Sequence, residues 1–173
     1  MLPSVTPFNQ IIPTYPLTEA GPIPTACDPE GVYPYTSFTQ TAKQSVPKSY
    51  RCVRLENEHL VAVVCQDTGG RLISLKTKNP DGSQTETLFD SGVVRPVRIL
   101  PRGAFIGGGI ELSFPISHTP SLLEKVHCEH GTEKGRAFVR FGERELRFGM
   151  QWTGEFSLGE SDRFLTQRAA FHN

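Results

Sequence analysis

From residue 50 onward, apolar and polar residues alternate with a period of two, and turn-forming residues interrupt the pattern at short intervals. In the first such run, Cys52 and Arg54 would face one side of an extended chain, and Val53 and Leu55 would face the other. Because successive strand residues point to opposite faces of a sheet, this pattern predicts β-strands. No stretch combines a sustained 3.6-residue period with helix caps. Short strands separated by frequent turns therefore predict an all-β sandwich or barrel.

The turns can be placed from residues that tolerate unusual backbone angles. Asn-Pro-Asp-Gly at 79–82 is the clearest turn signal in the chain, and further turns are predicted at 57–58 and 67–70. The strands predicted around them are 50–57, 59–66, 71–78, 86–90, 122–130, 135–141, 144–157 and 163–172.

Residues 1–49 differ from the rest because they are rich in Pro, Thr, Ser and Gly. Proline lacks a backbone N–H, so such a segment does not continue as a helix or as a central strand. We therefore interpret 1–49 as an extended arm packed on a single β-sandwich domain at 50–173, since 173 residues favour one domain. The expected apolar anchors of the arm are Ile11, Ile12, Tyr15, Val32, Tyr33 and Tyr35.

The charge balance and the cysteines restrict the partners and the compartment. Lys plus Arg and Asp plus Glu both number 18, and a neutral chain lacks the basic surface that nucleic-acid binding requires. No apolar run approaches the ~20 residues of a membrane helix, and no secretion signal begins the chain, so we expect a cytoplasmic protein that does not contact membrane. Cys52 and Cys65 lie in apolar strand patterns that predict buried thiols. We expect no cofactor, because no phosphate-binding loop is found.

Several motifs occur in the order of a known family, within a match of about 140 residues. Their number and order make the match specific. They are Val32-Tyr33-Pro34-Tyr35, Gly69-Gly70-Arg71, Gly108-Gly109-Ile110-Glu111, Phe114-Pro115 and His118-Thr-Pro-Ser121. In these residues the chain resembles an uncharacterised galactose-mutarotase-like domain family that is often fused to tetratricopeptide repeats.

The resemblance implies a galactose-mutarotase-like β-sandwich, or supersandwich, of which this chain is the N-terminal part. Mutarotases use a catalytic carboxylate from the C-terminal part and a histidine from the middle, and neither matches a position here. The final strand at 163–172 would then lack the neighbours that the family supplies from later sequence. Exposed strand edges recruit other strands, so we expect a homo-oligomer.

The candidate site combines Arg71, Glu111 and His118 with the aromatic residues Tyr33 and Tyr35. Arg and Glu side chains can hydrogen-bond vicinal sugar hydroxyls, and an aromatic ring can pack against the C–H face of a sugar. Phe105 and Trp152 are alternative aromatic platforms. Two structural alternatives stay open: Glu111 pairs with Arg71 or Arg102 to join two strands, and His118 binds a nearby carbonyl.

These residues predict a carbohydrate-binding module without a complete catalytic set. One alternative is a sugar-processing enzyme, an epimerase, lyase or hydrolase, with Glu111 and His118 as acid and base. Another is a structural unit that assembles through its strand edges. The run His127-Cys-Glu-His130 places only two potential ligands on each face of a strand, so we expect no metal site.

Overall fold

The computed structural model describes residues 1–19, 38–99, 103–114, 123–146 and 148–173. Within this part of the chain there is no α-helix, and no helix that is long and apolar enough to cross a membrane. The prediction of an all-β protein is confirmed. The elements are β1 (Ser4–Thr14), β2 (Leu17–Glu19), β3 (Phe38–Thr41), β4 (Val46–Glu56), β5 (Leu60–Cys65), the 3₁₀ turn η1 (Gln66–Thr68), β6 (Arg71–Lys78), β7 (Gln84–Glu86), β8 (Val97–Ile99), β9 (Gly103–Phe105), β10 (His127–Glu133), β11 (Arg136–Arg144), β12 (Gln151–Gly159) and β13 (Thr166–His172).

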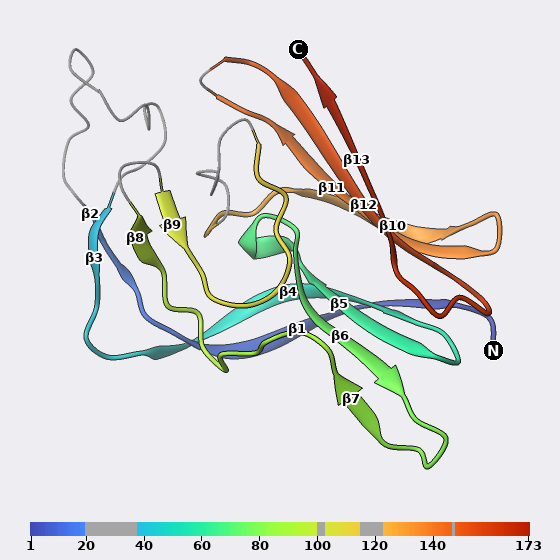
Figure 1. The fold of residues 1–173 in the computed structure, drawn as a ribbon. Helices are drawn as coiled ribbons and strands as arrows, with labels where there is room; N and C mark the ends of the chain where they lie inside the picture. Colours follow the sequence, from blue (N-terminus) through green and yellow to red (C-terminus); the bar gives the residue numbers. More distant parts are fainter. Residues whose placement is uncertain (20–37, 100–102, 115–122, 147) are drawn as a thin grey trace.

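Two antiparallel sheets pack on each other as a sandwich (Figure 1). The first sheet has the strand order β1-β4-β5-β6-β7, and the second has the order β10-β11-β12-β13. The hairpins β2-β3 and β8-β9 lie together at one end of the first sheet. The predicted sandwich is therefore confirmed, and its strands follow the turn signals closely at 71–78.

The core between the sheets is built from alternate residues of facing strands. Phe141 of β11 lies at its centre, with its ring 5.5 Å from Phe156 and 6.1 Å from Trp152, centroid to centroid. Gly70 makes room for it: a Cβ on this residue, whose φ is +75°, would lie 2.1 Å from the Phe141 ring. The remaining buried members of this cluster are Val53, Leu55, Leu60, Ala62, Val64, Leu72, Val126, Ala137, Val139 and Leu158.

The first sheet is also covered on its outer face, the face turned away from the second sheet. Tyr50, Cys52 and Cys65 form a second buried cluster there with Val94 and Ile106, which come from the chain between β7 and β10. Burial on both faces explains why β5 reads as a continuous apolar run rather than as an alternation. The expectation that Cys52 and Cys65 are buried free thiols is confirmed.

The N-terminal segment differs from the expected arm because much of it belongs to the first sheet. Strand β1 pairs with β4 along its whole length, and β4 begins at Val46, before the expected domain start. The prolines fit because β1 is an edge strand. Pro13 accepts a hydrogen bond from the Val94 N–H at 2.9 Å, so its backbone faces away from β4, and Pro7, six residues earlier, faces the same way. Neither proline interrupts the ladder.

Strand β13 is the edge strand of the second sheet, and most of its side chains are exposed. It is the last strand in the order of the second sheet, and Phe171 is half exposed although its ring lies 4.6 Å from Phe114. Pairing of this edge with a further strand or a second copy of the chain stays a prediction.

A buried asparagine joins the two sheets at one end of the sandwich. Asn57 is fully buried in the turn between β4 and β5, and its Oδ1 accepts hydrogen bonds from the N–H groups of His59 and Leu60, both at 2.8 Å. Its Nδ2 donates to the carbonyl oxygens of Gly159 and Asp162, both at 2.8 Å, in the turn between β12 and β13. One side chain therefore makes hydrogen bonds to backbone groups of both turns.

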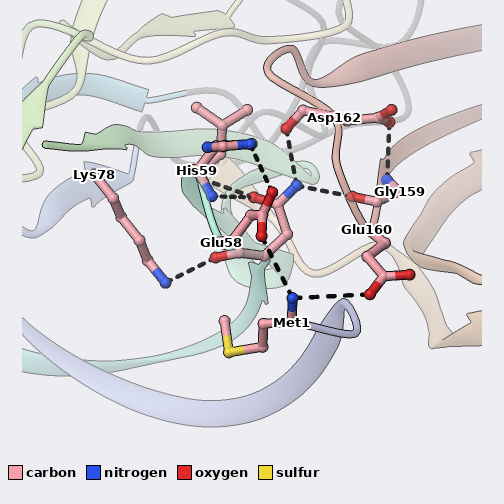
Figure 2. A network of polar contacts seen from close by, with 9 residues as sticks. Met1, Glu58, His59, Lys78, Gly159, Glu160 and Asp162 are labelled. Atoms are coloured by element: carbon pink, nitrogen blue, oxygen red, sulfur yellow. Dashed lines mark hydrogen bonds and ion pairs between the residues drawn. The ribbon is translucent and has the colours of Figure 1, made fainter. Parts of the chain in front are cut away.

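Charged residues surround this junction (Figure 2). The Lys78 ammonium donates to the Asn57 carbonyl oxygen at 2.7 Å. The N-terminal amine lies 3.5 Å from the Glu58 carboxylate and 3.8 Å from that of Glu160, so it bridges the two turns from outside. These exposed pairs contribute little individually, and the buried amide dominates.

We predict that Asn57→Ala lowers the free energy of unfolding by about 2–4 kcal/mol, because four hydrogen bonds in two turns are lost and, among the described residues, only the Gly159 carbonyl keeps another partner, the Asp162 N–H. Urea denaturation followed by circular dichroism measures the change. The control is Asn9→Ala, which removes an exposed asparagine from β1 and should leave stability within about 0.5 kcal/mol. Equal stability of the two variants would contradict the proposed role of Asn57.

Candidate functional site

A pocket of about 430 Å³ opens on the outer face of the first sheet. Side chains of β1, β5 and β6 form its floor, and residues 89–94 and 106–109 form its walls. Small-molecule sites are concave and place a few polar groups among apolar ones, and this pocket is concave with both polar and apolar side chains in its lining. We call it the Phe89 pocket, after the aromatic residue at its rim.

A wider hollow of about 860 Å³ lies over the outer face of β10–β13. Its central side chain, Arg140, donates to Glu155 at 2.6 Å and to Glu133 at 2.7 Å, and its guanidinium carbon lies 4.1 Å from the centroid of the Phe138 ring. Because these charges satisfy one another, the face reads as a solvated ion-pair network. We therefore place the candidate site in the Phe89 pocket.

Arg71, the first residue of β6, lies at the floor of the Phe89 pocket with a side chain that is only 5% exposed. Its Nη1 donates to the carbonyl oxygen of Gly108, and its Nη2 donates to the carboxylate of Glu111. Burial lowers the pKa of Arg71, and the negative charge of Glu111 opposes that effect. Among the described residues the buried Nε has no hydrogen-bond partner.

Glu111 holds the wall of the pocket against β6. One of its oxygens receives the Arg71 guanidinium, and the other accepts a hydrogen bond from the Ser113 hydroxyl at 3.0 Å. Beside this pair, Leu72 and Ile110 exchange two backbone hydrogen bonds of 2.9 Å. Arg71 and Glu111 are thus brought together as an ion pair between two segments, one of the alternatives that the sequence left open.

The triple glycine permits a close approach of backbones at this wall. Gly108 has a φ of +86°, and a Cβ at this position would lie 2.5 Å from the carbonyl oxygen of Phe89. A side chain would therefore collide with a rigid backbone atom. The close approach at Gly108 positions the Phe89 segment over the pocket.

The segment that carries Phe89 was expected to be a strand at 86–90, but only Glu86 belongs to β7. The Glu86 carboxylate accepts a hydrogen bond from the Ser74 hydroxyl at 2.6 Å. It also accepts three from backbone N–H groups, those of Leu75 at 2.9 Å and of Thr87 and Leu88 at 3.1 Å. Burial alone would raise the pKa of Glu86, but these hydrogen bonds outweigh it and lower the pKa. The carboxylate takes the Leu75 N–H, which a longer β6–β7 pairing would use, and β7 ends at Glu86.

Phe89 is the residue that the sequence reasoning missed. It lines the pocket and is 72% exposed, although a large apolar side chain usually lies inside the protein. The available signal was a phenylalanine followed directly by Asp90, Ser91 and Gly92, a turn-forming sequence. Hydrogen bonds from the Gly92 N–H to Asp90 at 2.7 Å and from the Ser91 hydroxyl to the Val93 carbonyl at 2.8 Å fix that turn.

Lys76 and Gln10 add polar groups to the lining of the pocket. Within the described residues, the Lys76 side chain has no ion pair or hydrogen bond. The Asp90 carboxylate accepts one hydrogen bond in this part of the chain, from the Gly92 N–H. The pocket therefore combines an exposed aromatic ring with polar side chains that can still bind a ligand.

Three of the residues expected at the site, Tyr33, Tyr35 and His118, lie outside the described residues. The alternative aromatic platforms do not fit: Trp152 is buried in the core, and Phe105 does not line the pocket. Trp152 and Phe156 lie on the same face of β12, and that face is turned to the core. Alternation in the sequence shows that the two residues share a face, but it does not show which face is turned inward. In the described part of the chain no three His, Cys, Asp or Glu residues lie close enough to hold a metal ion.

We predict that Glu111→Gln lowers the free energy of unfolding by about 3 kcal/mol, because the amide leaves the buried Arg71 charge unpaired. Chemical denaturation at neutral pH measures the effect. Glu129→Gln removes a carboxylate that is 69% exposed and lies 3.9 Å from Arg140, so it should change stability by less than about 0.5 kcal/mol. A stable Glu111→Gln variant would mean that the ion pair does not hold the pocket wall.

Comparison with known proteins places this chain in a family. A family model described as a domain of unknown function (DUF5107) matches residues 27–173. The crystal structure of a TPR-domain containing protein from Parabacteroides distasonis ATCC 8503 is similar, with a TM-score of 0.91 and 46% sequence identity. The match covers 99% of this chain but only 29% of that protein's chain. Since the family model spans most of the sequence, the chain belongs to the DUF5107 family.

Proposed function

We propose that this chain is a carbohydrate-binding module of the galactose-mutarotase-like kind and that its ligand occupies the Phe89 pocket. The motifs at Gly69–Arg71 and Gly108–Glu111, on which the resemblance to mutarotase-like domains rests, both border this pocket or its wall. The similar tetratricopeptide-repeat protein agrees with the expected fusion of such domains to repeats.

The observation that carries the proposal is the exposed ring of Phe89 beside a concave, polar floor. Leaving an aromatic side chain in water forgoes about 2 kcal/mol of burial, so an exposed ring at a pocket rim favours a ligand that covers it. The C–H face of a sugar ring has the size and polarity to do so, while its hydroxyl groups remain able to reach hydrogen-bonding partners.

The polar lining supplies those partners. The Lys76 ammonium can donate to a ring hydroxyl, and the Asp90 carboxylate can accept from one. The buried Nε–H of Arg71 adds a second donor near the floor. Charged groups make stronger hydrogen bonds than neutral ones, so two or three such contacts orient a sugar against the ring of Phe89.

We assign Glu111 a positioning role rather than an acid–base role in this proposal. Its two oxygens receive the Arg71 guanidinium and the Ser113 hydroxyl, and it is not among the residues that line the pocket. Its effect on a ligand passes through Arg71 and the wall at Gly108. The proposal is accordingly a binding function, with no reaction assigned to this chain.

Saturation-transfer NMR with a panel of neutral monosaccharides and disaccharides tests the proposal. We predict that at least one sugar binds and that Phe89→Ala weakens its binding about tenfold or more, because the variant loses the stacking surface. Phe164→Ala is the matched control, since Phe164 is 65% exposed and does not line the pocket. The absence of binding across the panel, or equal losses in both variants, would overturn the proposal.

A further inference from the structure

Two free cysteines lie side by side on adjacent strands of the first sheet. Cys52 of β4 is the direct register partner of Cys65 of β5, and the two residues are 2% and 1% exposed. Residues directly opposite each other in an antiparallel pair project to the same face, and both cysteines belong to the cluster on the outer face. The thiols are therefore neighbours in the buried cluster on the outer face.

The hydrogen-bond pattern of the β4–β5 hairpin fixes the type of this pair. The Asn57 N–H donates to the Leu60 carbonyl oxygen at 3.1 Å, which makes 57 and 60 a hydrogen-bonded pair. Hydrogen-bonded and non-hydrogen-bonded pairs alternate along an antiparallel ladder, and the register from Glu56–Val61 to Cys52–Cys65 has no bulge. Cys52–Cys65 is five steps from the turn and is consequently a non-hydrogen-bonded pair.

That pair type suits a covalent bond between the strands. The Cα atoms of a non-hydrogen-bonded pair lie about 4.5 Å apart, whereas those of a hydrogen-bonded pair lie about 5.5 Å apart. Disulfides span Cα separations of roughly 4.4–6.8 Å, so the strands do not have to part or slide for a bond to form. The backbone therefore holds the two sulfur atoms ready for oxidation.

The two thiols are chemically unequal. The hydrogen bond between them raises the pKa of Cys52, as does burial, and it lowers the pKa of Cys65 against the opposing effect of burial, so Cys65 is the more nucleophilic of the two. Cys65 also lines the Phe89 pocket, which gives a small reagent a route to it. Cys128, by contrast, has a pKa that burial raises to about 11, and it stays a protonated thiol.

We propose that Cys52 and Cys65 are a redox-active dithiol that hydrogen peroxide, entering through the Phe89 pocket, converts to a cross-strand disulfide. This inference does not depend on which ligand the pocket binds. It assigns a modification site to a pair of residues that otherwise only fills the outer core.

The reaction balances with the peroxide as the two-electron oxidant. The Cys65 thiolate attacks one peroxide oxygen, the O–O bond breaks, and the departing hydroxide takes up the proton that Cys65 has lost, giving water and a Cys65 sulfenic acid. The Cys52 sulfur then attacks the Cys65 sulfur, the S–O bond breaks, and the hydroxyl leaves with the Cys52 proton as the second water. Two thiols and one peroxide yield one disulfide and two waters.

The test uses the Cys27→Ser/Cys128→Ser variant of the full chain, in which Cys52 and Cys65 are the remaining cysteines. Native protein is treated with hydrogen peroxide, free thiols are alkylated, and intact mass and peptide maps are recorded. We expect the mass to fall by two hydrogens, peptides containing Cys52 and Cys65 to be linked, and dithiothreitol to restore both thiols. Recovery of two alkylated cysteines, or of Cys65 sulfinic acid beside free Cys52, would overturn the proposal.

A second variant separates the two steps. Cys52→Ala removes the resolving thiol, so the Cys65 sulfenic acid should persist and react with dimedone, whereas Cys65→Ala should give no dimedone adduct at Cys52. An adduct at Cys52 of similar yield would contradict the assigned roles. Wild-type protein provides the structural control: the native fold should link Cys52 to Cys65 selectively, and oxidation in urea should give mixed pairings. Mixed pairings from the native protein would also count against the proposal.

Discussion

The buried amide of Asn57 is the contact on which the arrangement of the sandwich depends. Its oxygen accepts two backbone N–H groups of the turn between β4 and β5. Its nitrogen donates to the carbonyl groups of Gly159 and Asp162, more than a hundred residues later in the chain. Apolar packing between sheets is not directional, so it does not select one alignment by itself. A fully satisfied amide between two turns does, because any sliding of the sheets would leave buried polar groups without partners.

The same junction also sets the chemistry of the outer face. With Asn57 and Leu60 paired at the turn, the register of β4 and β5 follows residue by residue, and Cys52 meets Cys65 in a non-hydrogen-bonded pair. Further along the first sheet, the register of β5 and β6 places Arg71 opposite Cys65, at the floor of the Phe89 pocket. The turn between β4 and β5 thus positions the dithiol, and the register of β5 and β6, which shifts between Val63 and Val64, positions the buried guanidinium.

The first sheet differs from an ordinary sandwich sheet because both its faces are occupied. The inner face supplies the core around Phe141, and the outer face carries the segment between β7 and β10. That cover is attached through apolar contacts, in which Val94 and Ile106 pack on Tyr50, Cys52 and Cys65, and through polar contacts such as the Arg71–Glu111 ion pair. A cover held at separate points leaves space beneath it, and the Phe89 pocket is that space.

The local features of this protein could be predicted from its sequence. Period-two alternation and turn residues specified the all-β class, the strand at 71–78 and the turn at 79–82, because strand direction and turn geometry depend on neighbouring residues. Motif resemblance also selected Arg71 and Glu111. Three features could not be predicted in this way and depend on long-range packing: segment 4–14 is an edge strand, Phe89 lies at a pocket rim, and Asn57 binds the turn beyond β12. Each of these features is a contact between residues far apart in the chain, and alternation carries no information on which distant segment covers a given face.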